Sequence, residues 1–537
     1  MNGDLSGHAS DIVSVLTQKR GITSEGTAPL LFRDTARASE RLQRAIAKRE
    51  QIGIFGDYDC DGITGTALLM RMLRRRGVEP LVRLPHRAYD GYGLKISHIE
   101  EFAAAGISLL LAVDTGISAH AAVKRAAELG IDVIIFDHHM LPEIVPEAYA
   151  IIHPSVMDTP PESAPCAAGV VFDFLCAFEG MNWEGIDEDR VLAMIGTVAD
   201  VVSLRGRNRT LVQEGLRTLE QLQTGPLAEL AARVRTGSAP LTSQDIAFRI
   251  APRINAAGRM ADPMLALRAI LEGRSALDEL EALNRTRQDD TLTAMQHALS
   301  CISAAGDAPL FLCAADERYE PGIIGLIAGK LTERFGRPSM AVCIRGEECT
   351  ASLRSPAAYS IIEGLQRASV HLTAFGGHRQ AAGCTFPLTA LTALTQALEK
   401  DVALHVPAEN LLPTLAIDCA LPLRAVSLPL IRSLRDLEPF GHENPEPLFL
   451  VEGASLSALR TVGAEGKHLQ AMIGHCKAIG FGLGDFLAEA GAPLDLVCRL
   501  GIDTWNGRMQ PQLFIVDMRV AAQKLTTLVS DKSVFSY

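Results

Sequence analysis

Three aspartates stand at alternate positions in the segment GDYDCDG, residues 56–62. They are Asp57, Asp59 and Asp61, and the apolar run IGIF (52–55) comes directly before them. Carboxylates this close together repel one another, so their ionised forms are costly unless a cation neutralises them. The segment therefore predicts a cation site.

Two other well-known loops do not fit the segment. A calcium loop of the EF-hand type needs a glutamate at its twelfth position and a helix before it. Counted from Asp57 that position is Leu68, and a strand-like run comes first. A phosphate loop needs Gly-Lys followed by Ser or Thr, which GDYDCDGITGT lacks. An acidic centre for hard divalent cations remains.

Short apolar strands alternate with helices around this motif. Strands are expected at 52–55, 80–84, 108–113 and 131–136, and helices at 63–77, 95–106 and 118–130. Strands of this kind alternating with helices indicate βαβ units and a parallel sheet covered on both faces. The expected fold class is therefore α/β.

Polar residues follow three of the expected strands. The aspartates of GDYDCDG follow the first, Asp114 follows SLLLAV, and the triplet Asp137-His138-His139 follows IDVIIF. Because sites in open α/β sheets lie beyond the carboxyl ends of the strands, we expect these residues to converge. Carboxylates with a histidine suit Mn²⁺ or Mg²⁺, and their number suffices for two ions. Two such ions can activate water and stabilise a leaving oxygen, which is the chemistry of phosphoester hydrolysis.

The rest of the chain divides into three further parts. Residues 265–302 are rich in helix formers and predict a long helix or a helix pair that joins two lobes. A second α/β region follows, with strands at 309–314 and 339–345 around a helix at 323–336. Short strands separated by turns then predict a small β-barrel-like domain; they are expected at 448–453, 468–474 and 512–521.

Composition narrows the class of protein. The formal net charge of −12 argues against a protein that coats nucleic acid through bulk charge, although it permits a local basic groove. The eleven cysteines include no CxxC pair, so neither a zinc ribbon nor a thioredoxin-type site is indicated. The N-terminus lacks the apolar core of a signal peptide, and no apolar run approaches the roughly 20 residues of a membrane span. We expect a cytoplasmic protein that does not contact a membrane.

Four segments resemble, in order and spacing, the acidic motifs of the DHH phosphoesterases; they are GDYDCDG, VDTG (113–116), DHH (137–139) and GTVADVVSL (196–204). Five more are similar to the RecJ family of single-strand-specific 5′→3′ DNA exonucleases; they are PHRAYDGYGL (85–94), APRINAAGRM (251–260), PGIIGLIAGKL (321–331), GGHRQAAG (376–383) and LEPFGHENPEPLFL (437–450). The similarity runs from about residue 25 to 520. A lone DHH triplet is weak evidence, whereas nine motifs in order are specific.

The resemblance assigns roles to the acidic centre. It implies metal ligands at Asp59, Asp61, Asp114, His138 and Asp200. Asp114 is expected to bridge the two ions, with Asp57 beside them as a further ligand or as an orienting residue. His139 is expected to contact the scissile phosphate and Asp137 to orient its neighbours. Several DHH phosphatases have a ligand histidine where this chain has Phe55, so one ion is expected to have fewer protein ligands.

It also implies residues that hold DNA. These are Arg87, Arg253, Asn255, Arg259, Arg354, Gly376, Gly377 and His378. Arginine suits bidentate contact with phosphate, and the glycines would let the main chain approach it closely. Outside their motifs, an arginine of this kind is more often in a surface ion pair, and Asn255 is as well suited to capping a turn as to touching substrate.

The expected organisation is a DHH domain (1–210), a helical connector (211–304), a DHHA1-like domain (305–405) and an OB-like domain (412–525). The implied function is a metal-dependent exonuclease that releases 5′-mononucleotides from single-stranded DNA in repair and recombination, with two Mn²⁺ or Mg²⁺ ions. A single-strand-binding protein and a helicase are the partners it suggests. Two alternatives stay open: a DHH phosphodiesterase acting on short RNA or cyclic dinucleotides, and a catalytically silent DHH scaffold.

Overall fold

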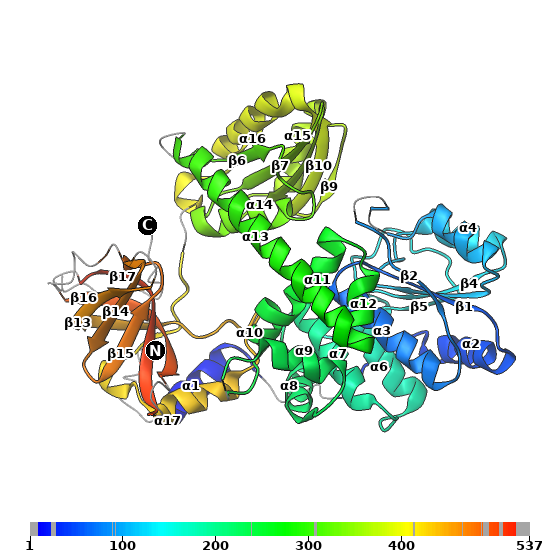
Figure 1. Cartoon of the computed structure of the whole chain (residues 1–537), viewed down its shortest axis with the longest axis horizontal. Coiled ribbons are helices and arrows are strands. Elements are labelled where there is room, and N and C mark those ends of the chain that lie inside the picture. Colours follow the sequence, from blue (N-terminus) through cyan, green and yellow to red (C-terminus); the bar gives the residue numbers. More distant parts are fainter. Residues whose placement is uncertain are drawn as a thin grey trace.

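The structure is a computed structural model with three lobes (Figure 1). It describes residues 9–22, 28–87, 90–91, 93–237, 239–304, 309–411, 414–463, 466–484, 486, 493–503 and 508–521. Three residues of the PHRAYDGYGL motif (88, 89 and 92) lie outside the described residues, as do the expected domain limits at 1, 305, 412 and 525.

The first lobe is built on a five-stranded parallel sheet in the order β2-β1-β3-β4-β5. Its strands are β1 (Ile52–Gly56), β2 (Leu81–Arg83), β3 (Leu109–Val113), β4 (Asp132–Phe136) and β5 (Ala150–Ile152). Its helices are α2 (Thr35–Lys48), α3 (Cys60–Arg75), α4 (Ile96–Ala104), α5 (His120–Glu128), η1 (Pro154–Val156), α6 (Ala167–Glu179), α7 (Ile186–Ala199) and α8 (Gly206–Gln221).

Alternate residues of the strands point into two separate cores. Ile54 and Leu111 pack with α2, α3, α6 and α7 on one face of the sheet. Phe55 and Leu110 pack with α4 and α5 on the other. This period of two is what a strand buried on both faces requires, and it explains why the strands read as continuous apolar runs.

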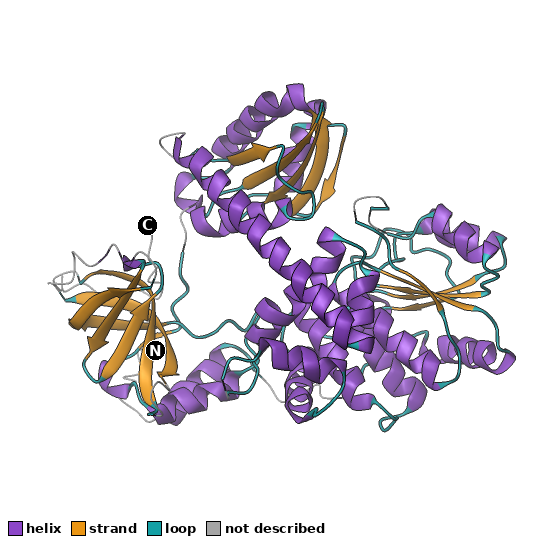
Figure 2. Cartoon of the chain, in the orientation of Figure 1, coloured by secondary structure: helices purple, strands orange, loops and turns teal. Residues whose placement is uncertain are grey.

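The first and second lobes are joined by helices of the connector, visible as the central helical mass in Figure 2. They are α9 (Pro226–Val234), α10 (Ser243–Asp245), the π-helical turn η2 (Ile246–Ile250), α11 (Ala251–Met260), α12 (Met264–Glu272) and α13 (Arg274–Ala304). Leu277 and Leu280, early in α13, belong to the core of the first lobe. Ala294, Ala298 and Ile302, near its end, pack on the second lobe. One helix of 31 residues therefore spans both lobes.

The second lobe has a mixed sheet in the order β6-β7-β8-β10-β9. Its strands are β6 (Leu312–Asp316), β7 (Ser339–Arg345), β8 (Glu348–Arg354), β9 (Ala374–Gly377) and β10 (Ala381–Pro387). Its helices are α14 (Ile324–Phe335), α15 (Ile361–Arg367), η3 (Ser369–His371), η4 (Leu388–Ala390) and α16 (Leu391–His405).

The third lobe is a mainly antiparallel seven-stranded sheet in the order β11-β12-β16-β17-β15-β14-β13. Its elements are η5 (Ala408–Leu411), β11 (Cys419–Ala420), η6 (Leu423–Ala425), α17 (Leu428–Ser433), η7 (Leu434–Leu437), β12 (Phe449–Ala454), β13 (Leu456–Val462), β14 (His468–Ile473), β15 (Cys476–Gly480), β16 (Leu494–Asp503) and β17 (Gln510–Val520). Helix α1 (Ala9–Lys19), from the other end of the chain, lies beside α17 in Figure 1 and adds Ile12 and Leu16 to this core.

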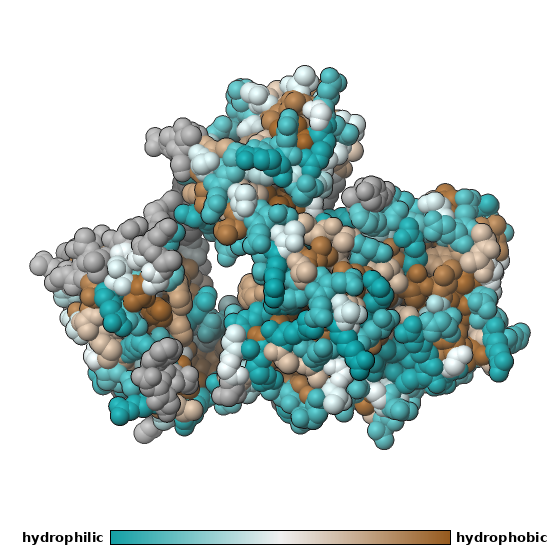
Figure 3. All heavy atoms as spheres, in the orientation of Figure 1, coloured by the Kyte–Doolittle hydropathy of each residue, from teal (hydrophilic) through white to brown (hydrophobic). Residues whose placement is uncertain are grey.

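The expected fold class is confirmed, with local differences. Helix α3 begins at Cys60 and not at residue 63, so Asp61 belongs to its first turn. Strand β6 begins at Leu312, three residues after the expected start at 309. Within the described part of the chain, every helix is too short or too polar to cross a bilayer. In the projection of Figure 3 an opening is visible between the three lobes.

Candidate metal centre and nucleic-acid site

The opening motif forms the turn between β1 and α3. The Asp57 N–H donates to the carbonyl of Val113 at 3.2 Å, which ties the end of β1 to the end of β3. Asp59 is the N-cap of α3: its Oδ1 accepts the N–H groups of Asp61 and Gly62 at 3.0 and 3.2 Å. The cap explains why the helix starts at Cys60. The first N–H groups of a helix have no carbonyl of a preceding turn to accept them, and Asp59 accepts two of them.

Asp61 lies across from the start of another helix. Its two carboxylate oxygens accept the N–H groups of Ala167 and Ala168, at 2.7 and 2.8 Å, in the first turn of α6. The positive end of a helix dipole favours a carboxylate there. These contacts hold a side chain that is 1% exposed beside the other acidic residues.

The residues after β3 and β4 complete the centre. Asp114 is buried and has a φ of 59°, a left-handed conformation that is uncommon outside glycine, asparagine and aspartate. The carboxylate of Asp137 accepts hydrogen bonds from the N–H groups of Ile117, His138 and His139 and contacts His139 Nδ1 at 2.7 Å. Asp137 thus fixes the positions of both histidines.

These residues form three overlapping groups in which the potential ligand atoms lie within 4.8 Å of one another. The groups are Asp57, Asp59 and Asp114; Asp61, His138 and Asp200; and Asp114, His138 and His139. Nε2 of His138 lies 3.3 Å from Asp114, 3.5 Å from Asp200 and 3.8 Å from Asp61. All the predicted metal ligands are therefore brought together at the carboxyl ends of the strands, with Asp114 shared by two groups.

Their electrostatics require cations. Burial and then the neighbouring carboxylates raise the pKa of Asp57 and Asp114 well above the ordinary value, and that of Asp200 to about 8. Oδ1 of Asp57 and Nε2 of His138 are buried and make no hydrogen bond with any described residue. Buried polar atoms without partners are costly, and oxygen-rich groups with one histidine match Mn²⁺ or Mg²⁺. The residues present thus fit divalent cations.

A cavity of about 300 Å³ opens over this centre. Its lining combines acidic residues of the centre with Tyr58, Arg87, Asn255, Gly258 and Arg259. Arg87 stacks over the ring of Tyr58 at 5.4 Å. Burial and the charges of Arg87 and Arg287 lower the pKa of Arg259 to about 10. Guanidinium groups so placed are suited to an anion, since among the described residues no carboxylate pairs with Arg87 or Arg259.

Arg354 comes to this region from the second lobe. Burial and then the charge of Arg87 lower its pKa, and its Nη1 donates to Leu353 and Ser352. Strand pairing sets Arg354 opposite Ala381 and Ala382 opposite Gly377, so Arg354 lies at the same end of the sheet as the GGHR segment.

Other predicted substrate residues are placed differently. The Arg253 guanidinium is held by Glu281 at 2.6 and 3.1 Å and by the Arg249 carbonyl, and Arg253 does not line the cavity. Asn255 does line it, and its Oδ1 accepts the Cys60 N–H at 2.8 Å, which docks α11 on the start of α3. Gly376, Gly377 and His378 are exposed, at edge strand β9 or just after it, outside the lining of this cavity. The contacts of Gly376, Gly377 and His378 with DNA stay predictions.

Two features of the site escaped the sequence analysis. Tyr58 and Gly258 line the cavity, and the N–H groups of Ala167 and Ala168 hold Asp61. An aromatic residue inside an acidic loop was a usable signal for Tyr58. Main-chain donors leave no side-chain signal, so the α6 contact was not accessible to motif reasoning.

Gly258 is where α11 meets the metal-binding loop most closely. A Cβ there would lie 2.4 Å from the carbonyl oxygen of Tyr58. We expect Gly258→Ala to push the loop away, lower the free energy of unfolding by about 1–3 kcal/mol as overpacking does, and raise the Mn²⁺ concentration needed for half-maximal activity. Gly329→Ala is the matched control, because its Cβ would meet no atom within 4 Å. Thermal unfolding measures the stability of each variant, and a Mn²⁺ titration of activity measures the concentration needed for half-maximal activity. If the two variants had equal stability and equal Mn²⁺ dependence, the tight contact at Gly258 would be contradicted.

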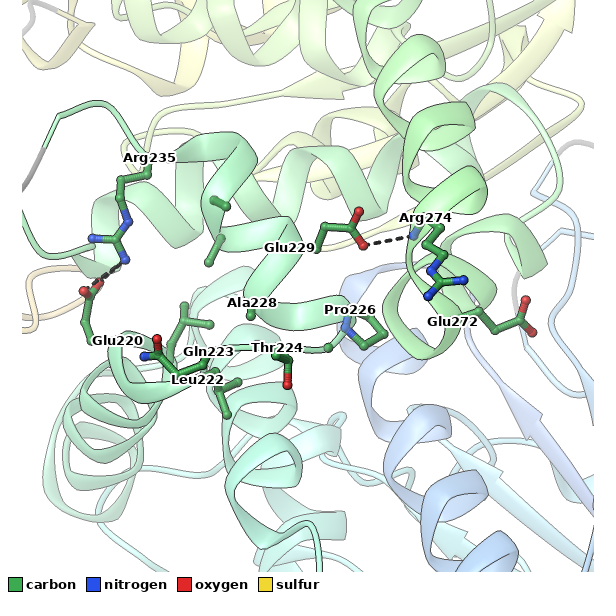
Figure 4. Close-up of a pocket in the computed structure, with 14 residues that line it drawn as sticks. Glu220, Leu222, Gln223, Thr224, Pro226, Ala228, Glu229, Arg235, Glu272 and Arg274 are labelled. Carbon is green, nitrogen blue, oxygen red and sulfur yellow. Dashed lines mark hydrogen bonds and ion pairs between the residues drawn. The ribbon is translucent and has the colours of Figure 1, made fainter.

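A second cavity, of about 750 Å³, lies at the end of α8 and along α9 (Figure 4). Two of its polar contacts are internal: Arg235 pairs with Glu220, and the Arg274 N–H donates to Glu229. Side chains of both signs are distributed around it and none of the predicted site residues lines it. It offers no grouping of ligands comparable with the acidic centre.

Comparison with known proteins gives the same picture. The chain matches the family models of the DHH family N-terminal domain over residues 51–199, the DHHA1 domain over 307–403 and the RecJ OB domain over 417–517. It is 31% identical to the single-stranded-DNA-specific exonuclease RecJ of Bacillus subtilis, over 97% of this chain and 69% of that protein.

Solved structures agree. The crystal structure of RecJ from Thermus thermophilus in complex with Mn²⁺ superposes with a TM-score of 0.83 at 30% identity, covering 95% of this chain and 76% of that one. The complex of the same protein with Mg²⁺ gives 0.76 at 29%, covering 95% and 75%. This chain therefore belongs to the RecJ family of single-stranded-DNA-specific exonucleases.

Proposed function

We propose that this chain hydrolyses single-stranded DNA from its 5′ end, one 5′-mononucleotide at a time, at the centre formed by Asp57, Asp59, Asp61, Asp114, His138 and Asp200. The observation that carries the proposal is one cavity lined both by residues of this acidic centre and by Arg87 and Arg259. An acidic centre alone would repel a phosphodiester, and an arginine cluster alone would only bind it. Together in one cavity of about 300 Å³, the two can hold one phosphate beside the metal ligands.

The cations are Mn²⁺ or Mg²⁺, held by the carboxylates and by Nε2 of His138. When bound, two such ions supply an activated water and neutralise charge on the leaving oxygen. Asp114 and His138 each belong to two of the ligand groups, and of these Asp114 would be the shared ligand, because a carboxylate has two oxygens that can bind two ions.

The chain's own residues orient the substrate. His139 lines the cavity, and its Nδ1 is held by Asp137, so the ring is fixed for contact with a phosphate oxygen. Arg87 and Arg259 bind the phosphate that approaches the centre, and Arg354 adds a contact from the second lobe. Asn255 keeps α11 against the metal-binding loop, so the distance between arginine and carboxylate is set by a hydrogen bond.

Selectivity for a single strand follows from the size of the site. We expect a cavity of about 300 Å³ to admit a nucleotide end and to exclude a base-paired duplex. The third lobe supplies a further surface for the strand, as OB domains do. The expected cytoplasmic location, and the expected partners, a single-strand-binding protein and a helicase, stay predictions.

A time course on 5′-labelled and 3′-labelled single strands tests the proposal. With Mn²⁺ or Mg²⁺ we expect labelled mononucleotide at once from the 5′-labelled strand, a descending ladder from the 3′-labelled strand, and no product with a chelator. Blunt duplex and a short RNA dinucleotide serve as comparison substrates. Digestion of the duplex at the single-strand rate, or preference for the dinucleotide, would refute the proposal in favour of a different phosphodiesterase.

A further inference from the structure

A second cluster of reactive side chains lies where α13 packs on the second lobe. His297 and Cys301 are one turn apart on α13, Asp316 ends β6, and Tyr319 follows it. Nε2 of His297 lies 3.2 Å from Asp316 Oδ2 and 3.6 Å from Cys301 Sγ. None of the four residues lines the cavity over the acidic centre, so the proposed hydrolysis does not use them.

Tyr319 and Asp316 contact the two ring nitrogens of His297. The Tyr319 hydroxyl lies 3.3 Å from the Ala294 carbonyl oxygen, to which it can donate. It also lies 2.9 Å from His297 Nδ1 and so holds the ring at that nitrogen. The other nitrogen, Nε2, faces the carboxylate of Asp316 and the thiol of Cys301.

Cys301 differs from the other cysteines of the chain. Of the eleven free cysteines, it alone is exposed; Cys313 and Cys419 are half-buried and the remaining eight are buried. Burial raises the pKa of Cys313 and Cys419 to about 11, which keeps those thiols protonated. Cys301 combines exposure with an adjacent base, the arrangement that activates cysteine in thiol chemistry.

We propose that Cys301 is a site of covalent modification by low-molecular-weight disulfides, with His297 as its base and with Asp316 and Tyr319 as the residues that position His297. The thiol proton passes from Sγ to Nε2. The thiolate then attacks one sulfur of the disulfide, so that an S–S bond forms to Cys301 as the original S–S bond breaks, and the second sulfur leaves as a thiolate that takes a proton from water. The modified residue lies on the helix that joins the two lobes, and no residue of the nuclease site takes part.

Arg318 supports this assignment of roles. It holds both oxygens of Asp316, with Nε to Oδ1 at 2.7 Å and Nη2 to Oδ2 at 2.8 Å. The carboxylate is therefore fixed in place before the imidazole accepts a proton. Asp316 and Tyr319 then hold the ring from its two nitrogens, which leaves it little freedom to turn away from Cys301.

The rate of mixed-disulfide formation tests the proposal on the reduced, full-length chain with oxidised glutathione as the probe. We expect one adduct per folded chain, mapped to Cys301 by peptide mass spectrometry. At neutral pH it should form about tenfold faster than at the same cysteine in the urea-unfolded chain, because an ordinary thiol is mostly protonated there. This comparison needs no variant and is independent of nuclease activity.

Variants then separate the base from simple exposure. His297→Gln should slow adduct formation about tenfold while Cys301 stays exposed. Asp316→Asn should slow it less, Cys301→Ser should abolish it, and Cys419→Ser should leave it unchanged. Thermal unfolding checks that each variant is folded. An adduct at another cysteine, or equal rates in the folded and unfolded chains, would overturn the proposal; so would an unchanged rate in folded His297→Gln.

Discussion

Asp114→Asn is expected to reduce nucleotide release by on the order of 10³-fold, as removal of one charge at the centre of an electrostatic site does. Asp114 belongs to two of the three ligand groups, so no other single replacement removes charge from as many. Asparagine is the appropriate substitute because, like aspartate, it tolerates the left-handed φ of 59°. Alanine would add backbone strain to the loss of the ligand.

Asp132→Asn is the matched control. It makes the same chemical change at the opposite end of the sheet, at the start of β4, where the side chain pairs with Arg41 at 2.5 Å. The Asp132 side chain is 39% exposed, and the buried Arg41 keeps its pair with Glu50 at 2.8 Å, so we expect nearly normal activity. Release from a labelled single strand at saturating Mn²⁺ measures turnover, and fluorescence anisotropy measures DNA binding. Asp114→Asn should still bind DNA; if it kept a tenth of normal turnover, Asp114 would not be the shared ligand.

Much of the metal centre was predictable from the sequence because of one topological rule. Asp57, Asp114 and His138 are far apart in the chain, yet each follows a short apolar strand, and parallel strands bring their carboxyl ends to one edge. The strands were recognisable because burial on both faces leaves continuous apolar runs, such as LLLAV in β3. The pattern thus determined both the fold class and the location of the centre.

The second role of Asp59 was not predictable in the same way. When Asp59 is treated only as a metal ligand, α3 is expected to start at residue 63. Asp59 also caps the N–H groups of Asp61 and Gly62, however, and the helix therefore starts at Cys60. A capping aspartate and a metal-binding aspartate have the same sequence signature. Phe55, where some relatives of the fold have a histidine ligand, packs with α4 and α5 at 4.8 Å from the ring of His98. Phe55 belongs to the core on the sheet face away from α3. A phenyl ring at that position supplies no metal ligand.

The arginines of APRINAAGRM show which information the sequence analysis lacked. The motif was not assigned to a helix from the sequence, so its residues could not be sorted by face. In α11, Asn255 and Arg259 are four residues apart and share a face, while Arg253 is two residues from Asn255 and points elsewhere. The structure accordingly places Arg259 in the cavity and Arg253 on Glu281.

This difference gives a prediction with an internal control. Arg259→Gln is expected to lower kcat/KM on single-stranded DNA by about 10–100-fold, because a hydrogen bond to a charged phosphate is worth about 1.5–3 kcal/mol. Arg253→Gln removes the same charge from the same helix, but from a guanidinium already held by Glu281. It should lower the free energy of unfolding by about 1 kcal/mol and leave kcat/KM within about twofold.

The two variants are compared on one substrate, a 5′-labelled single strand, with thermal unfolding measured alongside. A greater loss for Arg259→Gln than for Arg253→Gln at equal stability would assign the phosphate contact to the cavity-facing side of α11. The opposite order would mean that Arg253 leaves Glu281 when DNA binds and that the cavity residues do not receive the phosphate. The two arginines carry the same charge on the same helix and differ mainly in the side of the helix they occupy. The ratio of their effects therefore reports the effect of position, with the change in charge held constant.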